Sequence, residues 1–270
     1  MSMKYKLLVL DLDGTLTNTK KEITEHTRNT LMEAQERGIK IVLASGRPTY
    51  GVAPIAEKLE LKKYGGYILS YNGGEIINWQ TGEMMYANVL DAEVLPYLYQ
   101  CSKENQFAIV TYKDKYVITE HPNDEYVLKE AILNVMETKK VDNFLEAVDF
   151  PVAKCMIVGE PTRLAGLEKD MYEVLKDLMG VYRSESYFLE LVPKGIDKAQ
   201  SLAVLLEKIG YTKEEMIAIG DGFNDKSMIE FAGLGVAMAN AQEVVKQAAD
   251  YITLSNEEDG VVAVVEKFML

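Results

Sequence analysis

The sequence predicts an α/β protein in which the two ends of the chain form one parallel, Rossmann-like sheet and an α+β segment is inserted between them. Three observations carry this prediction. Short apolar runs alternate with helical patterns at the start of the chain, which is typical of a parallel sheet with helical connections. After about residue 88 the order changes to helix, strand, strand, and after about residue 190 the first rhythm returns. We therefore expect a core of residues 1–87 and 191–270 and an insertion of residues 88–190.

The first part of the core begins with a continuous apolar run at residues 7–10, which favours a strand buried on both faces. Thr24 is suited to cap a helix that runs to about Arg37, because Gly38 follows as a stop signal. The remaining elements expected here are strands at 39–44 and 67–70, a helical stretch after Pro48, and a turn at 71–74.

The insertion and the second part of the core follow from the same patterns. In the insertion we expect helices at 91–104, 124–136 and 162–179, and an antiparallel sheet with strands at 107–112, 116–119, 154–158 and within 181–192. In the second part of the core we expect helices at 198–209 and 224–231 and strands at 216–219 and 234–238.

Composition excludes several classes of function. The 270 residues carry a formal net charge of −13, which argues against non-specific binding to nucleic acid and against a polybasic membrane contact. Cys101 and Cys155 have no partner at a zinc-binding or redox spacing, so neither a metal nor a disulfide is expected of them. The N-terminal residues lack a signal-peptide pattern and no apolar run is long enough for a membrane span, which predicts a cytoplasmic protein. Nothing in the sequence indicates an oligomeric state.

The first candidate motif is Asp11-Leu12-Asp13-Gly14-Thr15, directly after the first strand. In open α/β sheets the carboxyl ends of the strands are where ligands bind. Two carboxylates so close together repel each other unless a cation or a shared proton relieves them. Gly14 allows the tight turn that this spacing needs.

The second motif is Gly220-Asp221-Gly222-Phe223-Asn224-Asp225, again directly after an apolar strand. Alone it could be a glycine-rich turn with a helix cap. Together with the first motif it indicates a Mg²⁺ site, because this ion takes carboxylate ligands, waters and substrate phosphate oxygens. Asp221 and, with less support, Asp225 are the candidate ligands beside Asp11.

Two weaker signals point to an anion. Ser45 and Gly46 end a strand just before Pro48, so a hydroxyl and an amide could meet an anion at a helix N-terminus. Lys198 opens a helix, where a positive charge is unfavourable unless an anion lies beside it.

Together these segments resemble the four ordered motifs of the haloacid dehalogenase-like superfamily, and most closely its Cof-type sugar-phosphatase branch. The resemblance spans the whole chain, with two motifs before the insertion and two after it, as in members with a large cap between the second and third motifs. It implies an Mg²⁺-dependent phosphatase for small phosphate esters, with specificity in the cap.

The resemblance also implies the role of each residue. Asp11 would be the nucleophile that becomes phosphorylated, and Asp13 the general acid and base. Asp11, the Asp13 backbone carbonyl and Asp221 would hold Mg²⁺, with Asp225 nearby. The phosphoryl oxygens would be bound by the Leu12 amide, Ser45, the Gly46 amide, Lys198 and Asn224.

Arg47 and Asn72 are candidates for contacting a second polar group of the substrate, although Arg47 could instead pair with a core carboxylate. Two alternatives stay open. A phosphomutase would need a second phosphate-binding site, usually built from several arginines, and the insertion contains only Arg163 and Arg183. A non-catalytic regulatory module would be expected to lack Asp11, Asp13 or Asp221. The identity of the phosphorylated metabolite has no readable signal.

Overall fold

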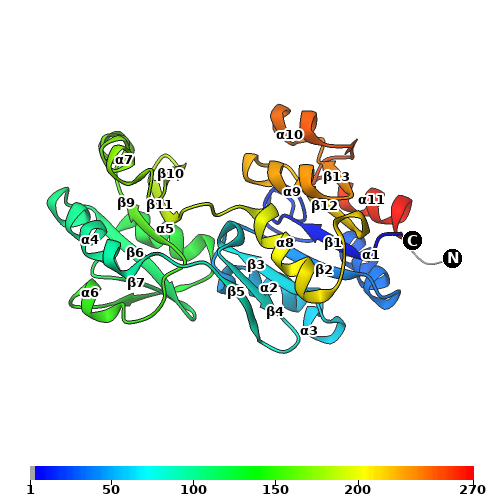
Figure 1. Cartoon of the computed structure of the whole chain (residues 1–270), viewed down its shortest axis with the longest axis horizontal. Coiled ribbons are helices and arrows are strands. Elements are labelled where there is room, and N and C mark those ends of the chain that lie inside the picture. Colours follow the sequence, from blue (N-terminus) through cyan, green and yellow to red (C-terminus); the bar gives the residue numbers. More distant parts are fainter. Residues whose placement is uncertain (1–3) are drawn as a thin grey trace. The chain divides into compact units, whose positions relative to one another are not determined.

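The computed structural model describes residues 4–270, so the first three residues of the segment examined for a signal peptide lie outside the described part. The chain forms two compact units. The core unit comprises the described residues up to Tyr86 together with Asp197–Leu270, and the insertion unit comprises Ala87–Ile196. In Figure 1 the blue start and the yellow-to-red end of the chain build the core unit, and the green middle builds the insertion unit.

The core unit is built on an eight-stranded sheet in the order β14-β13-β12-β1-β2-β3-β4-β5. Its strands are β1 Leu7–Leu10, β2 Lys40–Ala44, β3 Tyr67–Ser70, β4 Glu75–Asn78, β5 Met84–Ala87, β12 Met216–Gly220, β13 Leu234–Ala237 and β14 Tyr251–Ile252. The pairs from β14 to β3 are parallel, whereas β4 is antiparallel to β3. The first strand of the chain lies at the centre, with Leu10 opposite both Leu43 and Ile219.

Helices cover this sheet and explain why its central strands are apolar. All four residues of β1 are buried, and the core cluster around them includes Leu31 and Leu205 from two of the helices. Thr24 caps the first helix as predicted, by accepting a hydrogen bond from the Thr27 amide. The helices of this unit are α1 Glu25–Glu36, α2 Thr49–Lys58, α3 Leu61–Tyr64, α8 Lys198–Ile209, α9 Lys226–Phe231, α10 Glu243–Ala248, α11 Gly260–Phe268 and the short 3-10 helices η1 Tyr71–Gly73, η3 Lys213–Glu215 and η4 Phe223–Asp225.

The insertion unit has its own six-stranded sheet in the order β10-β11-β9-β6-β7-β8. Its elements are η2 Ala92–Val94, α4 Leu95–Glu104, β6 Ala108–Lys113, β7 Tyr116–Thr119, α5 Glu125–Leu133, β8 Glu137–Lys140, α6 Phe144–Ala147, β9 Cys155–Val158, α7 Pro161–Leu175, β10 Met179–Glu185 and β11 Phe188–Pro193. The unit runs past residue 190 because β11 pairs with β9 and β10. Four of its five strand pairs are antiparallel, but β8 is parallel to β7, with α5 as the crossover.

The expected elements are found with two kinds of difference. The helix expected at 162–179 ends at Leu175, and Met179 already begins β10. There the backbone of Gly180 lies so close to β11 that a Cβ would be 2.8 Å from Val192 Cγ2. We did not predict β4, β5, β8, β14, α6, α10 or α11. Both cysteines are free thiols: Cys101 is half-buried, and Cys155 is fully buried, which raises its pKa to about 12.

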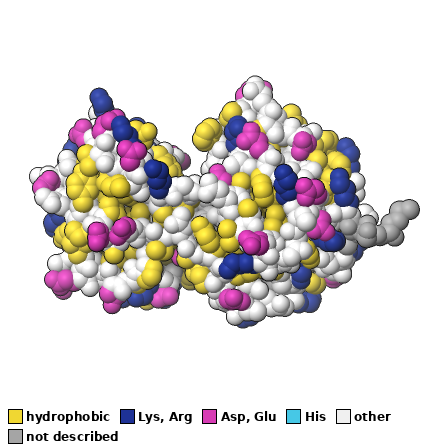
Figure 2. Space-filling view, viewed as in Figure 1, with side chains coloured by type: hydrophobic (Ala, Val, Ile, Leu, Met, Phe, Trp, Pro, Cys, Tyr) yellow, Lys and Arg dark blue, Asp and Glu magenta, His cyan; other side chains and the backbone are white. Residues whose placement is uncertain are grey.

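The surface carries mixed charge. On the face drawn in Figure 2, lysine and arginine side chains are scattered among aspartates and glutamates rather than gathered into one patch. Among residues 4–270, no helix combines the length and the hydropathy that crossing a bilayer requires.

Candidate active site

The parallel strands of the core unit bring the predicted motifs to one edge of the sheet. Asp11 follows β1, Ser45 follows β2 and Asp221 follows β12. Because the paired strands are in register and run in the same direction, these residues leave the sheet side by side. Asn72 joins them from the turn after β3.

Lys198 links three of these segments. Its ammonium group donates hydrogen bonds to Asp11 Oδ1 at 2.7 Å, to the Ala44 carbonyl at 2.9 Å and to Asp225 Oδ1 at 2.5 Å. The side chain is fully buried. Burial alone would lower the pKa of Lys198, but the charges of Asp11 and Asp225 outweigh burial and hold this pKa above its ordinary value. The unfavourable place of this lysine at a helix N-terminus is thus explained by anions beside it.

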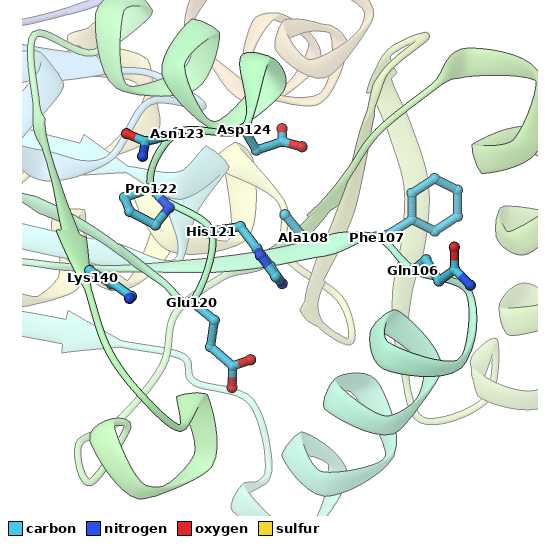
Figure 3. Close-up of a pocket in the computed structure, with 9 residues that line it drawn as sticks. All are labelled: Gln106, Phe107, Ala108, Glu120, His121, Pro122, Asn123, Asp124 and Lys140. Carbon is cyan, nitrogen blue, oxygen red and sulfur yellow. The ribbon is translucent and has the colours of Figure 1, made fainter.

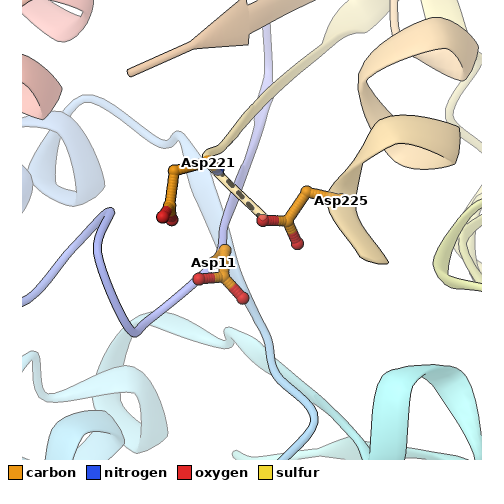
Figure 4. A group of neighbouring side chains, drawn as sticks. All are labelled: Asp11, Asp221 and Asp225. Atoms are coloured by element: carbon orange, nitrogen blue, oxygen red, sulfur yellow. Dashed lines mark hydrogen bonds between the residues drawn. The ribbon is translucent and has the colours of Figure 1, made fainter. Parts of the chain in front are cut away.

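Asp11, Asp221 and Asp225 form an acidic cluster whose nearest oxygens all lie within 4.8 Å of one another. Figure 4 shows their carboxylates facing the same space. Burial and the charge of Asp225 raise the pKa of Asp11 well above its ordinary value, although Lys198 opposes the shift. Burial also raises the pKa of Asp221 to about 6, against an opposing hydrogen bond from Thr15. Three carboxylates against one lysine leave an excess of negative charge, so the donor set fits a hard divalent cation.

Gly14 makes this cluster sterically possible. Its φ of +87° lies in the left-handed region, and a Cβ built there would lie 2.4 Å from Asp221 Oδ2. The next residue, Thr15, donates a hydrogen bond from its hydroxyl to Asp221 Oδ1 at 2.7 Å. The turn of the first motif therefore positions the carboxylate of the second.

Asp225 also stabilises the glycine-rich loop and orients Lys198. Its Oδ2 accepts hydrogen bonds from the backbone amides of Asp221 at 3.0 Å and Gly222 at 2.9 Å, while its Oδ1 accepts one from Lys198. Because both oxygens are engaged in holding the glycine-rich loop and the lysine, Asp225 is a weaker candidate for a direct metal ligand than Asp11 or Asp221.

Asp13 lies at the same edge but points to a different set of partners. Arg47 donates to its two oxygens, from Nε at 2.7 Å and from Nη2 at 2.5 Å, and Lys21 Nζ donates to Oδ1 at 2.6 Å. Burial alone would raise the pKa of Asp13, but the hydrogen bonds and charges of Arg47 and Lys21 hold this pKa below its ordinary value. Of the two roles considered for Arg47, the structure shows the pairing with a core carboxylate.

The segment after β2 supplies a hydroxyl and the start of a helix. Ser45 is buried, and its Oγ accepts a hydrogen bond from the Arg47 amide at 3.1 Å, which leaves the hydroxyl proton to be donated elsewhere. Pro48 is the N-cap residue of α2, directly before the first helical residue, Thr49. Gly46 leaves room for Asn72, since a Cβ there would be 3.1 Å from Asn72 Nδ2.

Asn72 and Asn224 contact each other. Asn224 Nδ2 donates a hydrogen bond to Asn72 Oδ1 at 2.9 Å. The site residues expected from the sequence all lie along this edge of the core sheet. Sequence reasoning missed Lys21 and Thr15. A threonine directly after the DxDG turn was a visible signal, whereas Lys21 carried none.

The insertion unit holds a pocket of its own, about 430 Å³ in volume. Figure 3 shows that its lining comes from the start of β6, from the loop that follows β7 and from the end of β8. The lining residues are Gln106, Phe107, Ala108, Glu120, His121, Pro122, Asn123, Asp124 and Lys140. Most of these side chains can donate or accept hydrogen bonds.

Known proteins are similar to this chain in both sequence and fold. The profile of the haloacid dehalogenase-like hydrolases matches residues 8–265. A crystal structure of a haloacid dehalogenase-like hydrolase from Bacteroides thetaiotaomicron is 59% identical, with a TM-score of 0.95 over 98% of this chain and 99% of that one. Phosphatase YwpJ of Bacillus subtilis (strain 168) is 32% identical over 285 residues, covering 95% of this chain and 97% of its own length. The structure of BT4131, described as a subclass IIB sugar phosphatase, is 25% identical, with a TM-score of 0.79 over 97% and 98% of the two chains.

Proposed function

The chain belongs to the haloacid dehalogenase-like hydrolase family, and from that premise we propose that it is an Mg²⁺-dependent phosphatase acting on small phosphorylated metabolites, sugar phosphates above all. The observation that carries the proposal is the buried Asp11, held by Lys198 at 2.7 Å beside two further carboxylates. A buried carboxylate in this setting is oriented for attack on phosphorus. YwpJ is described as a phosphatase and BT4131 as a sugar phosphatase, which supports the reaction class.

In the first half of the reaction, an Asp11 oxygen attacks phosphorus while the bond from phosphorus to the leaving alcohol oxygen breaks. Asp13 gives that oxygen a proton. Because Arg47 and Lys21 hold Asp13 as a carboxylate in this conformation, the step requires Asp13 to leave at least one of them before it carries a proton. In the second half Asp13 takes a proton from water, whose oxygen displaces Asp11 from phosphorus and releases inorganic phosphate.

Lys198 lies within hydrogen-bonding distance of Asp11 and would bring its positive charge to the phosphoryl group, whose own charge spreads over its outer oxygens as the bonds exchange. The Ser45 hydroxyl, the amides of Leu12 and Gly46 and the Asn224 side chain are the further donors for those oxygens. Asp11, Asp221 and the Asp13 backbone carbonyl would hold Mg²⁺, with Asp225 beside them. The bound ion would offset the repulsion between this acidic cluster and an incoming phosphate dianion.

Substitution of the two first-motif aspartates tests the mechanism. Asp11→Asn should lower turnover by at least roughly 10³-fold on every substrate, because an amide is a poor nucleophile. Asp13→Asn should do the same on an alkyl phosphate but should spare the first step on p-nitrophenyl phosphate, whose leaving group needs no proton. Purified Asp11→Asn protein that retains wild-type turnover would refute the covalent mechanism.

We place substrate discrimination in the insertion unit. Its pocket offers amide, imidazole, carboxylate and ammonium groups, which suit the hydroxyl groups of a sugar. Lys140→Ala should alter the order of kcat/KM among sugar phosphates, whereas its neighbour Lys139, which does not line the pocket, provides the matched Lys139→Ala control. An unchanged order in Lys140→Ala and Asn123→Ala would place discrimination elsewhere.

A hydrolase is favoured over a phosphomutase by the state of the two arginines in the insertion unit. Arg183 Nε donates to Glu168 at 2.7 Å, and Arg163 Nη2 donates to the Asn105 carbonyl at 2.6 Å. Since both are engaged within the unit, neither is held ready for a second phosphate. A regulatory module without catalysis is disfavoured because Asp11, Asp13 and Asp221 are all present at the same edge of the sheet.

A further inference from the structure

The turn after β3 has a left-handed backbone at three consecutive residues, two of which are not glycine. Tyr71, Asn72 and Gly73 have φ angles of +53°, +57° and +104°, all in the left-handed region. That region is unfavourable for tyrosine in particular, and a run of such residues persists only where the surroundings impose it. The mechanism above gives this turn no task.

Backbone contacts tie the turn to two of the phosphate-binding segments. The Tyr71 amide donates to the Arg47 carbonyl at 3.0 Å, and the Asn72 amide donates to the Ser45 carbonyl at 2.9 Å. On the other side, Ser201 of α8 donates its hydroxyl to the Gly73 carbonyl at 2.7 Å. A Cβ at residue 73 would lie 2.5 Å from Ser201 Oγ, so the approach of α8, which begins at Lys198, requires glycine there.

The Asn72 side chain ties the turn to the third segment. Asn224 is solvent-exposed and lies in the short helix η4, yet its amide nitrogen is fixed by the 2.9 Å hydrogen bond to Asn72 Oδ1. On the other side of the same carboxamide, a Cβ at Gly222 would lie 2.6 Å from Asn224 Oδ1, so the glycine makes room for it. An amide group has two N–H bonds, and fixing one of them sets the direction of the other.

We propose that Asn72 is a positioning residue, which aims the Asn224 amide at the phosphoryl group and through its strained turn holds the Ser45, Lys198 and Asn224 segments in one arrangement. This inference rests on the proposed function, because it assigns Asn224 to the phosphoryl group. It differs from the sequence-based role of Asn72 as a direct substrate contact. Asn72 acts here through Asn224.

The test uses glycine to separate the side chain from the backbone. Asn72→Gly keeps the left-handed conformation without a steric cost but removes the carboxamide. We expect kcat with p-nitrophenyl phosphate and Mg²⁺ to fall by roughly 10- to 100-fold, since a misplaced contact costs about this much. Inhibition by inorganic phosphate should weaken, while the thermal unfolding midpoint should be unchanged or higher. Asp114→Gly is the matched control, because Asp114 is also left-handed (φ +53°) but lies in the hairpin between β6 and β7.

A double-mutant cycle decides between the two roles. If Asn72 acts through Asn224, Asn72→Gly adds no further loss to Asn224→Ala, so the double variant equals Asn224→Ala in kcat and in phosphate inhibition. The inference is overturned if the kcat losses of the two single variants multiply in the double variant, or if Asn72→Gly has wild-type kinetics. Neither result affects the phosphatase assignment. The proposed function fails differently, through wild-type protein that is inactive with Mg²⁺ or indifferent to Asp11→Asn.

Discussion

Lys198 offers the sharpest test of how the site is held together. Lys198→Met keeps the length of the side chain but leaves Asp11 and Asp225 buried without their cation. Removing one partner of a buried ion pair costs about 3–5 kcal/mol of unfolding free energy, far more than a surface substitution. Loss of a charged donor to the phosphoryl group should in addition lower kcat at least roughly 10²-fold.

The unfolding free energy lost in Lys198→Met should depend on pH, and the titration of the buried carboxylates sets the direction of this dependence. Without Lys198 the folded-state pKa of Asp11 rises even further above its unfolded value. A carboxylate whose pKa is raised by folding destabilises the folded state when ionised, and this penalty disappears as the pH falls toward the unfolded value near 4. Folding raises the pKa of Lys198 above its unfolded value of 10.5. The stability that comes from the protonation of Lys198 is therefore fully present at any pH well below 10.5 and does not vary between pH 5 and 8. We therefore expect a full deficit at pH 8 and a smaller one at pH 5.

Urea unfolding can measure this, followed by the fluorescence of Trp79, the single tryptophan, which lies in the core unit. Lys208→Met is the matched control, because Lys208 is on the same helix but exposed, and its change should stay within about 0.5 kcal/mol. Equal midpoints for wild type and Lys198→Met at pH 8, or a deficit that is the same at both pH values, would refute the reasoning.

Two further predictions concern the acidic cluster. Because the pKa of Asp221 is raised to about 6, Mg²⁺ affinity measured by calorimetry should fall about tenfold per pH unit below pH 6. Thr15→Val removes a hydrogen bond that lowers this pKa, so it should move the fall in affinity to higher pH. A Mg²⁺ affinity that is constant from about pH 5 to 8 would contradict the assignment of Asp221 as a ligand. Gly14→Ala should abolish Mg²⁺ binding and cost more unfolding free energy than Gly38→Ala, because both glycines have positive φ but a Cβ at residue 38 meets nothing within 4 Å. Equal effects of the two substitutions would show that only backbone strain, and not contact with Asp221, matters at Gly14.

The catalytic edge could be predicted from the sequence because its residues follow apolar strands directly. Asp11 and Asp221 each end a buried run, and parallel pairing of those runs is enough to bring the two together. The contact between Asn72 and Asn224 could not be predicted, since the residues are 152 positions apart and neither belongs to a periodic pattern. Lys21 reaches Asp13 from an exposed loop, which leaves no trace in hydrophobic spacing.

The missed elements have equally concrete causes. Strand β8 has the sequence Glu-Thr-Lys-Lys, so its conformation comes from hydrogen bonding to β7 and not from an apolar face. Helix α11 contains the run Val-Val-Ala-Val-Val, whose β-branched residues favour a strand. It is helical because it packs against α1, where Asp259 at its N-terminus accepts hydrogen bonds from the Thr24 and Thr27 hydroxyls. Tertiary contacts outweigh local preference at both places.

The central position of β1 has a consequence for how the chain reaches its folded state. During synthesis β1 emerges first, yet one of its two neighbours, β12, follows only after the whole insertion unit has been made, since Leu7 pairs with Met216. The insertion sheet, by contrast, pairs only strands from one continuous stretch. Pairing β1 with β12 closes a long loop, whereas most strand pairs of the insertion unit are close in sequence. The insertion unit should therefore fold first, and one edge of β1 should stay unpaired until β12 is added. Pulse-labelled hydrogen exchange during refolding would then show amides of β6 and β9 protected before those of β1. For a ribosome-bound chain, that unpaired edge exposes backbone N–H and C=O groups with which a strand of another chain can pair.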